Sequence, residues 1–279
     1  MTISAAEIGK LRKLTGAGVM DCKRALEEAN GDQEQAVSII RKKGQLVASK
    51  RADRDASEGC VIAKISGDAT KGVITVLSCE TDFVAKNADF IRFTEDIADV
   101  ALKEGAVDLD AVKQLIVNGI SVAEGVNEKV AVIGEKIELT FFDSLEAAEV
   151  VAYIHPGNKL ACLAGFNKKL NDPQTGRDIA MQVAAMGPVA VDKGSVSAET
   201  IAKEMDIATE QAKNDPKNAN KSDAMIEKIA QGKLEKFFKE MILLNQEFIK
   251  DGKLTVADYL KKADKDLKVT KFIRFSLSV

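Results

Sequence analysis

Four cysteines and one histidine are the residues of this chain best suited to nucleophilic or metal chemistry. The cysteines are far apart and form no Cys-x-x-Cys pair, so their spacing predicts neither a zinc site nor a disulfide framework. Cys79 ends an apolar run that predicts a strand, and His155 precedes Pro156 in a predicted turn. A cysteine enzyme needs a base beside its thiol, and nothing in the sequence brings one to Cys79. The cysteines are Cys22, Cys60, Cys79 and Cys162.

Two glycine-containing segments resemble phosphate-binding loops, and neither has the required pattern. "GPVAVDKGS" (187–195) lacks the glycine that precedes the lysine of a P-loop. "GAGVMD" (16–21) has two glycines of a dinucleotide-binding fingerprint, but it follows a predicted helix and Asp21 occupies the position of the third glycine. The carboxylates fall on predicted helix surfaces without a visible pairing. We therefore predict that the chain is not an enzyme and has no cofactor and no metal site.

A carboxylate stands directly beside an aromatic ring in "CETDFVAKN" (79–87), between an apolar run, "GVITVL", and a helical pattern, "ADFIRFTEDIADVAL". Two interpretations are open. Phe83 could turn inward as a core residue while Asp82 caps the following helix, which is what the residues alone favour. Alternatively, both side chains could point outward and contact another molecule.

Composition and charge favour a soluble globular protein with a protein partner. The chain is 46% apolar and 30% charged, and it has no Trp and two Tyr, which counts against binding single-stranded nucleic acid by base stacking. Residues 1–55 carry 11 Lys/Arg against 8 Asp/Glu (net +3), and the remainder carries 29 against 35 (net −6). A weakly basic head on an acidic body fits a protein partner better than a nucleic-acid duplex, but charge alone favours a simpler explanation, helix ends whose exposed cations face the negative end of the helix dipole. Without a signal-like apolar core or an apolar run near 18 residues, we expect a cytoplasmic protein with no membrane contact.

Three short helices are predicted within the first 44 residues, a segment that we call the head. Ser4 and Glu7 form a capping-box pattern at the first helix, whose apolar side would include Ile8, Leu11 and Leu14. Glycines are expected to end the three helices: Gly16 and Gly18 the first, Gly31 the second and Gly44 the third. Residues 45–57 read as a charged linker. So small a module has a small core, which is typical of a domain that binds or docks on something.

From residue 58 onward, strand patterns alternate with helices, so the fold class is α+β. In each half the pattern predicts a β-hairpin, a helix and a late third strand: 59–67 and 71–79 with 136–144, then 150–166 with the final strand. We interpret this order as a diverged internal repeat. The second half carries an insertion in which apolar residues at spacings of three and four predict an antiparallel coiled-coil hairpin at about 197–245. Its second helix would bury Ala230, Leu234, Phe237 and Met241, followed by Leu244.

Two motifs connect the chain with a known family. "LRKLTGAGVMDCKRAL" (11–26) and "CETDFVAKN" (79–87) both resemble signature motifs of the elongation factor Ts family, and the order of elements along the whole chain is similar as well. The resemblance implies a UBA-like three-helix module with its linker (1–55), a core subdomain N (56–145), and a core subdomain C with the coiled-coil hairpin (146–279). Two departures are visible: Val76, Leu77 and Ser78 replace Glu-Val-Asn before the second motif, and no helical module follows the final strand before Val279.

The resemblance also implies a function and a partner. Members of this family promote GDP release from elongation factor Tu, binding its GDP-bound and nucleotide-free forms without direct contact to nucleic acid. By this resemblance, Thr81, Asp82, Phe83 and Val84 would disturb the partner's magnesium and nucleotide site. The head would dock through Leu11, Arg12, Thr15, Gly16, Gly18, Met20 and Lys23. A homodimer through the core or the hairpin is compatible with the pattern. The alternative is an adaptor without exchange activity, whose head binds a peptide or ubiquitin-like surface.

Overall fold

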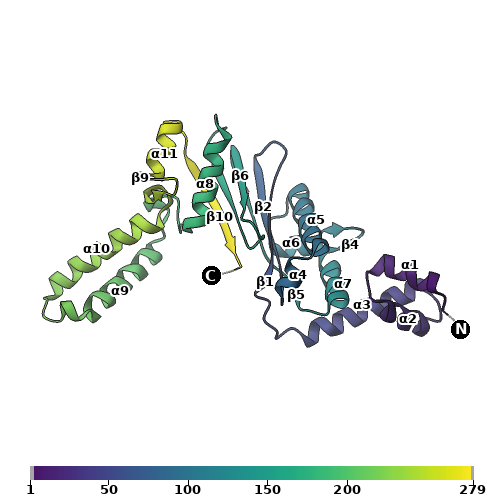
Figure 1. Cartoon of the computed structure of the whole chain (residues 1–279). Coiled ribbons are helices and arrows are strands. Elements are labelled where there is room, and N and C mark those ends of the chain that lie inside the picture. The colour runs from purple at the N-terminus through teal and green to yellow at the C-terminus, as the bar shows by residue number, and fades with distance from the viewer. Residues whose placement is uncertain (1–2, 278–279) are drawn as a thin grey trace.

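The computed structural model describes residues 3–277, beginning with the three-helix head (Figure 1). The helices are α1 (Ala5–Thr15), α2 (Val19–Glu28) and α3 (Gln33–Lys50). The predicted capping box of Ser4 and Glu7 is confirmed, and Gly16 ends α1 at φ 70°, a left-handed conformation that costs glycine little. Leu11, Cys22, Leu26 and Ile40 form the centre of a small apolar core. Leu14 was expected to join that core but is 63% exposed.

Helix α3 does not end at Gly44 as predicted but continues to Lys50. The reason is a close contact with α7 (Val122–Ile133), which the sequence alone does not reveal. A Cβ at Gly44 would lie 2.7 Å from the Cβ of Ala131 and 2.8 Å from the carbonyl oxygen of Asn127. Glycine therefore serves here to let two helices approach, and the extended α3 carries the head on the rest of the molecule (Figure 1).

Gly44→Ala is therefore expected to destabilise the chain by about 1 kcal/mol, because overpacking against α7 outweighs the better helix propensity of alanine. Gly232→Ala in the second hairpin helix is the matched control. A Cβ there meets nothing within 4 Å, so the same change is expected to stabilise by up to ~1 kcal/mol. Thermal unfolding of both variants shows whether the melting temperature falls for Gly44→Ala and rises for Gly232→Ala. An increase in the melting temperature of Gly44→Ala would contradict the close contact.

The first of two three-stranded sheets has the strand order β1-β2-β5, with every pair antiparallel. Its hairpin and its late third strand appear where they were predicted. A small two-stranded hairpin, β3–β4, was not predicted. The elements are β1 (Glu58–Ile65), β2 (Lys71–Cys79), α4 (Asp82–Ala85), α5 (Ala88–Glu104), α6 (Leu109–Gln114), β3 (Ile116–Val117), β4 (Ile120–Ser121) and β5 (Ile137–Glu146).

The second sheet, of order β6-β7-β10, has the same topology as the first, since a late strand again pairs with the second strand of a hairpin. The predicted turn at residues 156–158 is present, and Gly157 (φ 92°) and Asn158 (φ 55°) provide its positive φ angles. The hairpin β8–β9 and helix α11 were not predicted. The elements are β6 (Glu149–Ile154), β7 (Leu160–Phe166), α8 (Pro173–Met186), β8 (Glu247–Phe248), β9 (Asp251–Thr255), α11 (Val256–Ala263) and β10 (Val269–Ser276).

The two sheets pack face to face, with helices on their outer sides (Figure 1). Because strand side chains alternate, Val61 and Ile74 enter the layer between the sheets, whereas Cys60 and Leu77 face α5, α6 and α7. Phe141 and Phe275 meet across the sheets with ring centroids 4.5 Å apart. Helices α8 and α11 cover the outer face of the second sheet. Strands with two buried faces make the centre of the molecule a rigid support for what its edges present.

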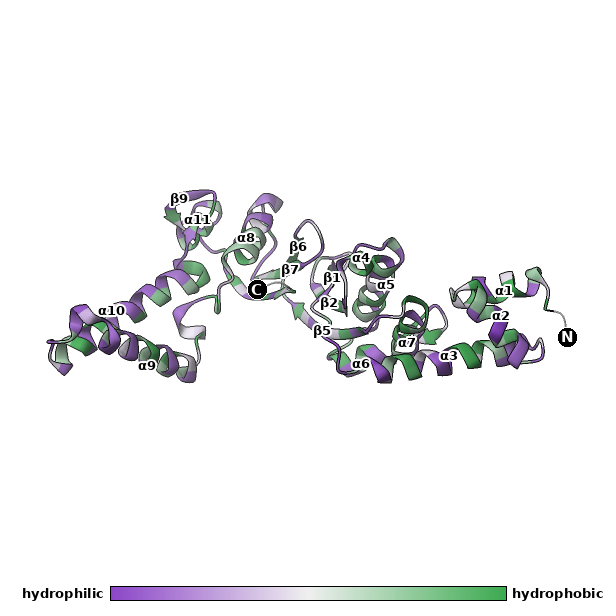
Figure 2. Cartoon of the chain, turned by 60° about the horizontal axis from the view of Figure 1, so that its bottom comes forward, coloured by the Kyte–Doolittle hydropathy of each residue, from purple (hydrophilic) through white to green (hydrophobic). Residues whose placement is uncertain are grey.

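The predicted helical hairpin consists of α9 (Ala198–Asn214) and α10 (Asp223–Met241), joined by a break that contains Pro216. Hydrophilic and hydrophobic residues alternate along both helices (Figure 2), and the head and the hairpin lie at opposite ends of an elongated molecule. Ala230 and Leu234 are buried as predicted. Phe238 is the buried aromatic residue in place of Phe237, and Leu244 belongs to a short 3-10 helix after α10. None of the helices within residues 3–277 is long and apolar enough to cross a membrane.

Candidate functional site

Residues 80–87, which we call the tip, connect β2 to α5 and contain the one-turn helix α4. Phe83 is 84% exposed, so the inward-facing interpretation that the residues alone favoured is wrong, and the outward-facing one that the resemblance implied is confirmed. Its neighbours face the opposite way: Ala85 is buried, and Val84 packs against the core beneath the first sheet. The helical turn thus separates side chains that adjoin in sequence, and it leaves the aromatic ring unsupported by its own chain.

The interpretation that Asp82 caps the following helix is also wrong, because α5 is capped by Asn87, whose Oδ1 accepts hydrogen bonds from the backbone N–H groups of Asp89 and Phe90 at 2.8 and 3.3 Å. The short helix α4 is capped by Thr81, whose hydroxyl accepts a hydrogen bond from the backbone N–H of Val84 at 3.5 Å. Asp82 is the first residue of α4 and pairs with Lys86 at 2.6 Å. The hydrogen bond from Lys86 lowers the pKa of the Asp82 carboxyl, so this group carries a negative charge at neutral pH. The tip therefore presents an anionic group beside an apolar ring.

The residues that depart from the family pattern before the tip have no exposed role. Val76, Leu77 and Ser78 are all buried in β2, as was expected for strand positions. The hydroxyl of Ser78 lies 2.8 Å from that of Thr140 on β5. These substitutions therefore affect packing within the sheet and leave the tip unchanged.

The predicted docking residues of the head divide into supporting and exposed groups. Leu11 has no exposed surface and belongs to the core of the head, so it can only support a contact surface. Thr15 donates a hydrogen bond from its hydroxyl to the carbonyl oxygen of Leu11 at 2.8 Å, Gly16 ends α1, and Gly18 caps α2. Arg12, Met20 and Lys23 are exposed.

Two exposed apolar residues of the head were not among the predicted docking residues. Leu14 is 63% exposed and Val19 is 49% exposed, and together with Met20 (59%) they flank the turn that contains Gly16 and Gly18. The only sequence signal was an apolar residue on each side of a glycine turn, and Leu14 fitted the helical period of a core residue equally well. We call Leu14, Val19 and Met20 the head patch.

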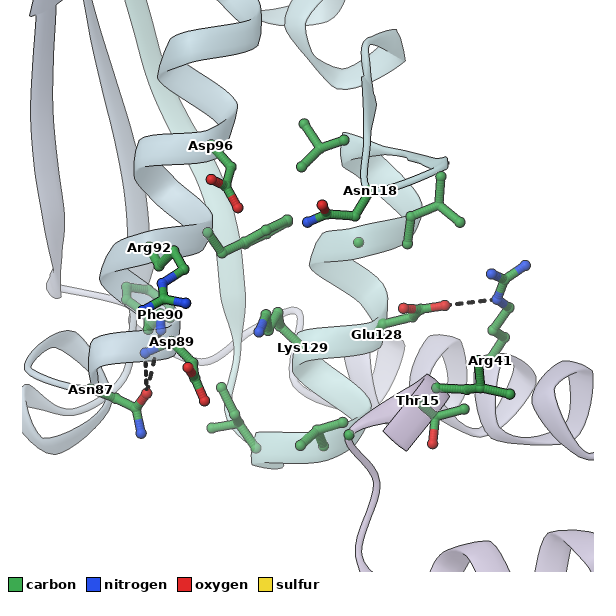
Figure 3. Close-up of a pocket in the computed structure, with 18 of the residues that line it drawn as sticks. Thr15, Arg41, Asn87, Asp89, Phe90, Arg92, Asp96, Asn118, Glu128 and Lys129 are labelled. Atoms are coloured by element: carbon green, nitrogen blue, oxygen red, sulfur yellow. Dashed lines mark hydrogen bonds and ion pairs between the residues drawn. The ribbon is translucent and has the colours of Figure 1, made fainter. Parts of the chain in front are cut away.

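A cleft of about 590 Å³ separates the head from α5 and α7 (Figure 3). Figure 3 shows Thr15 and Arg41 on the head side, and Asn87 and Asp89 at the start of α5 on the other side. Arg41 crosses to α7 through an ion pair with Glu128 at 2.8 Å. Leu14 also lines this cleft, so the structure brings one part of the head patch and the end of the tip to a single cleft although some 70 residues separate them in sequence.

The thiols are not arranged for nucleophilic chemistry. Burial raises the pKa of Cys79 to about 12, and its Sγ donates a hydrogen bond to the carbonyl oxygen of Thr81 at 3.2 Å. Burial likewise raises the pKa of Cys60 to about 11 and that of Cys162 to about 12. The Nδ1 atom of His155 lies 3.0 Å from the hydroxyl of Tyr153, which is on β6, the strand that ends just before His155. Protonated, buried thiols are typical of structural cysteines.

Comparison with known proteins assigns a family to this arrangement. The family model described as elongation factor TS matches residues 80–278. The proteins named elongation factor Ts of Christiangramia forsetii and Porphyromonas gingivalis are 50% and 47% identical to the chain, covering 99% and 100% of it and 98% and 99% of their own lengths. That of Azobacteroides pseudotrichonymphae is 44% identical over the whole of both chains. With such similarity from the head to the last strand, the chain belongs to the elongation factor Ts family.

Proposed function

We propose that the chain is the guanine-nucleotide exchange factor of elongation factor Tu: it binds the GDP form, promotes GDP release and stabilises the nucleotide-free form until GTP binds. The observation that carries this proposal is the tip, where Phe83 is 84% exposed next to the ionised Asp82. A role in protein synthesis would place the chain in the cytoplasm.

The chemistry of the tip suits this reaction. A guanine nucleotide is held by backbone N–H groups of a phosphate loop and by Mg²⁺, both of which favour negative charge. Phe83 acts as an apolar wedge between packed elements of the partner, while Asp82 competes for groups around the metal. Thr81 and Val84 fix the conformation of α4 from below. The factor thus lowers the affinity of the partner for the nucleotide without contacting the nucleotide itself.

Linkage sets the energy that the contact must supply. A factor that lowers the affinity of the partner for GDP a thousandfold must itself bind the nucleotide-free partner a thousandfold more tightly than the GDP-bound partner. This ratio corresponds to a difference in binding free energy of about 4 kcal/mol. A single exposed side chain does not supply this alone. We therefore assign attachment to the head patch with Arg12 and Lys23, and to core subdomains within 56–145 and 146–279, leaving the tip to distinguish the two nucleotide states.

The wild-type chain is expected to accelerate the release of a fluorescent GDP analogue from elongation factor Tu by at least about a hundredfold at saturation. Stopped-flow fluorescence against excess unlabelled GDP measures the rate at increasing factor concentration. The same linkage predicts that added GDP displaces the factor from a preformed complex, which gel filtration detects. A release rate that does not change with factor concentration would exclude the exchange function and leave the adaptor.

A further inference from the structure

Thr81, the second residue of the tip, is held through each of its polar groups. Its backbone N–H donates to Oε2 of Glu135 at 3.1 Å, and its hydroxyl donates to Oε1 of the same carboxylate at 2.8 Å. Its carbonyl oxygen accepts from the Sγ of Cys79 at 3.2 Å and from the backbone N–H of Ala85 at 3.2 Å. Glu135 lies in the turn between α7 and β5, so Thr81 is fixed to the segment that leads into the third strand of the sheet.

The adjacent residue, Glu80, is held by the same turn and by the end of α3. Glu80 accepts a hydrogen bond from the backbone N–H of Lys136 at 2.6 Å and pairs with Arg51 at 2.7 Å. The Nζ of Lys136 donates in turn to the carbonyl oxygens of Ala52 and Arg54, at 2.9 and 3.1 Å. The hydrogen bond from Lys136, together with Arg51, lowers the pKa of the Glu80 carboxyl. Arg51, Glu80, Glu135 and Lys136 form what we call the tip clamp.

The tip needs such support because its own secondary structure is too short to be stable. Helix α4 has four residues, and a single helical turn is unfavourable in isolation because few hydrogen bonds offset the ordering of the backbone. Phe83 adds nothing to the stability of the fold, since it is 84% exposed. The Asp82–Lys86 pair is on the surface, where ion pairs contribute little. Contacts below the tip must therefore fix its orientation.

We propose that Glu135 is a positioning residue for nucleotide exchange: by holding Thr81 through two hydrogen bonds, it keeps Phe83 and Asp82 in the orientation in which they enter the partner. This inference rests on the proposed exchange function. A tip that is ordered before binding loses less conformational entropy when it enters the partner. A variant whose tip is disordered in the free factor is therefore expected to release nucleotide more slowly. Attachment through the head patch does not involve Glu135 and is unaffected.

The first measurement is nucleotide release at increasing concentrations of factor variants. Glu135→Ala removes both acceptors and is expected to lower the maximal rate about tenfold, while the concentration for half of that rate changes less than about twofold. Glu135→Gln keeps an acceptor for the N–H of Thr81, and its amide can donate to the hydroxyl, so its rate is expected within about threefold of wild type.

The second measurement concerns the free factor and does not depend on exchange activity. Glu135→Ala is expected to accelerate amide hydrogen exchange in a peptide covering residues 80–87 by about tenfold or more, with β2 and α5 unchanged. Glu146→Gln is the matched control, because it removes a 68% exposed carboxylate at the far end of β5 whose partner is Lys71. It is expected to leave both the hydrogen exchange of the tip and nucleotide release unaltered.

The outcomes separate this inference from the function on which it rests. An inactive wild-type chain would overturn the exchange function, whereas hydrogen exchange would still report on the clamp. An active wild type together with wild-type rates and wild-type tip protection in Glu135→Ala would overturn the positioning role. A loss of protection spread over the whole chain in Glu135→Ala and Glu135→Gln alike would also overturn it, because Glu135 would then support the fold in general.

Discussion

Replacing Phe83 with alanine is expected to lower the maximal rate of GDP release from elongation factor Tu about thirtyfold, with little change in the factor concentration needed for half of that rate. The ring is 84% exposed in the free chain, so its apolar surface is available to be buried in the partner. Burial of a phenylalanine side chain contributes about 2 kcal/mol, which corresponds to this factor. Stopped-flow release of fluorescent GDP measures the maximal rate and the half-saturating concentration separately.

The stability of Phe83→Ala is expected to remain within about 0.5 kcal/mol of wild type, because the ring makes almost no contact with its own fold. Val107→Ala is the matched control, since it shortens another exposed apolar side chain (79%) outside the tip and is expected to leave release unchanged. A maximal rate equal to that of wild type in Phe83→Ala would exclude the wedge role. The adaptor alternative requires instead that neither the wild type nor Phe83→Ala accelerates GDP release.

Met20→Ala is expected to show the opposite kinetic pattern, raising the half-saturating concentration about tenfold while the maximal rate stays close to wild type. Met20 is 59% exposed in the head patch. Because the head contacts the partner away from the nucleotide, loss of this contact is expected to lower the affinity for the GDP-bound and the nucleotide-free partner equally. The double variant Leu14→Ala/Met20→Ala is expected to weaken docking further. Titration of the nucleotide-free complex by surface plasmon resonance or calorimetry measures the affinity directly.

Met225→Ala provides the control for this change, because Met225 is similarly exposed (52%) but lies on the hairpin at the opposite end of the molecule. Docking as tight as that of wild type in Leu14→Ala/Met20→Ala would exclude the head patch as an attachment surface. A truncated chain of residues 1–55 that retains the partner as tightly as the full chain would instead favour the adaptor. The contrast between Phe83 and Met20 thus tests whether attachment and exchange are separate tasks.

Local sequence patterns predicted most of the elements because the deciding interactions lie within a few residues. The capping box of Ser4 and Glu7, the left-handed Gly16 and the turn at Gly157 and Asn158 all satisfy their own backbone requirements locally. The alternation of apolar residues likewise predicted two hairpins with a late third strand. The family motifs in 11–26 and 79–87 are local too, which is why the family was evident from residues alone.

The errors arose where a distant contact decided the outcome. Gly44 reads as a helix end in sequence, but it is the point at which α3 touches Ala131, 87 residues further along the chain. Phe237 and Phe238 fit the helical period about equally, but Phe238 is the one that packs with Ala190 and lies under Lys193, in a segment more than 40 residues earlier in the chain. The short hairpins β3–β4 and β8–β9 have two to five residues per strand, too few for a periodic pattern.

For the candidate site, too, local features were predicted from the sequence and long-range contacts were not. The sequence placed an acidic residue beside an aromatic one at the end of a strand, and the motif identified the residues of the tip. Only the structure distinguished Leu11, which supports the head from inside, from Leu14 and Val19, which line its surface. It also revealed Glu135, a carboxylate with no sequence signature that contacts Thr81 from 54 positions away.

By itself, then, the sequence determined most of the helices and strands, the order in which they recur, and the family to which the chain belongs, because caps, turns and alternation act between near neighbours. The tertiary structure alone decided between the two orientations that were open for Phe83, showed that Gly44 lies inside a helix, and brought Leu14 of the head patch and Asn87 of the tip to one cleft. The physical reason is that the side of a helix or strand that is buried depends on what packs against it, and the packing partner is far away in the chain.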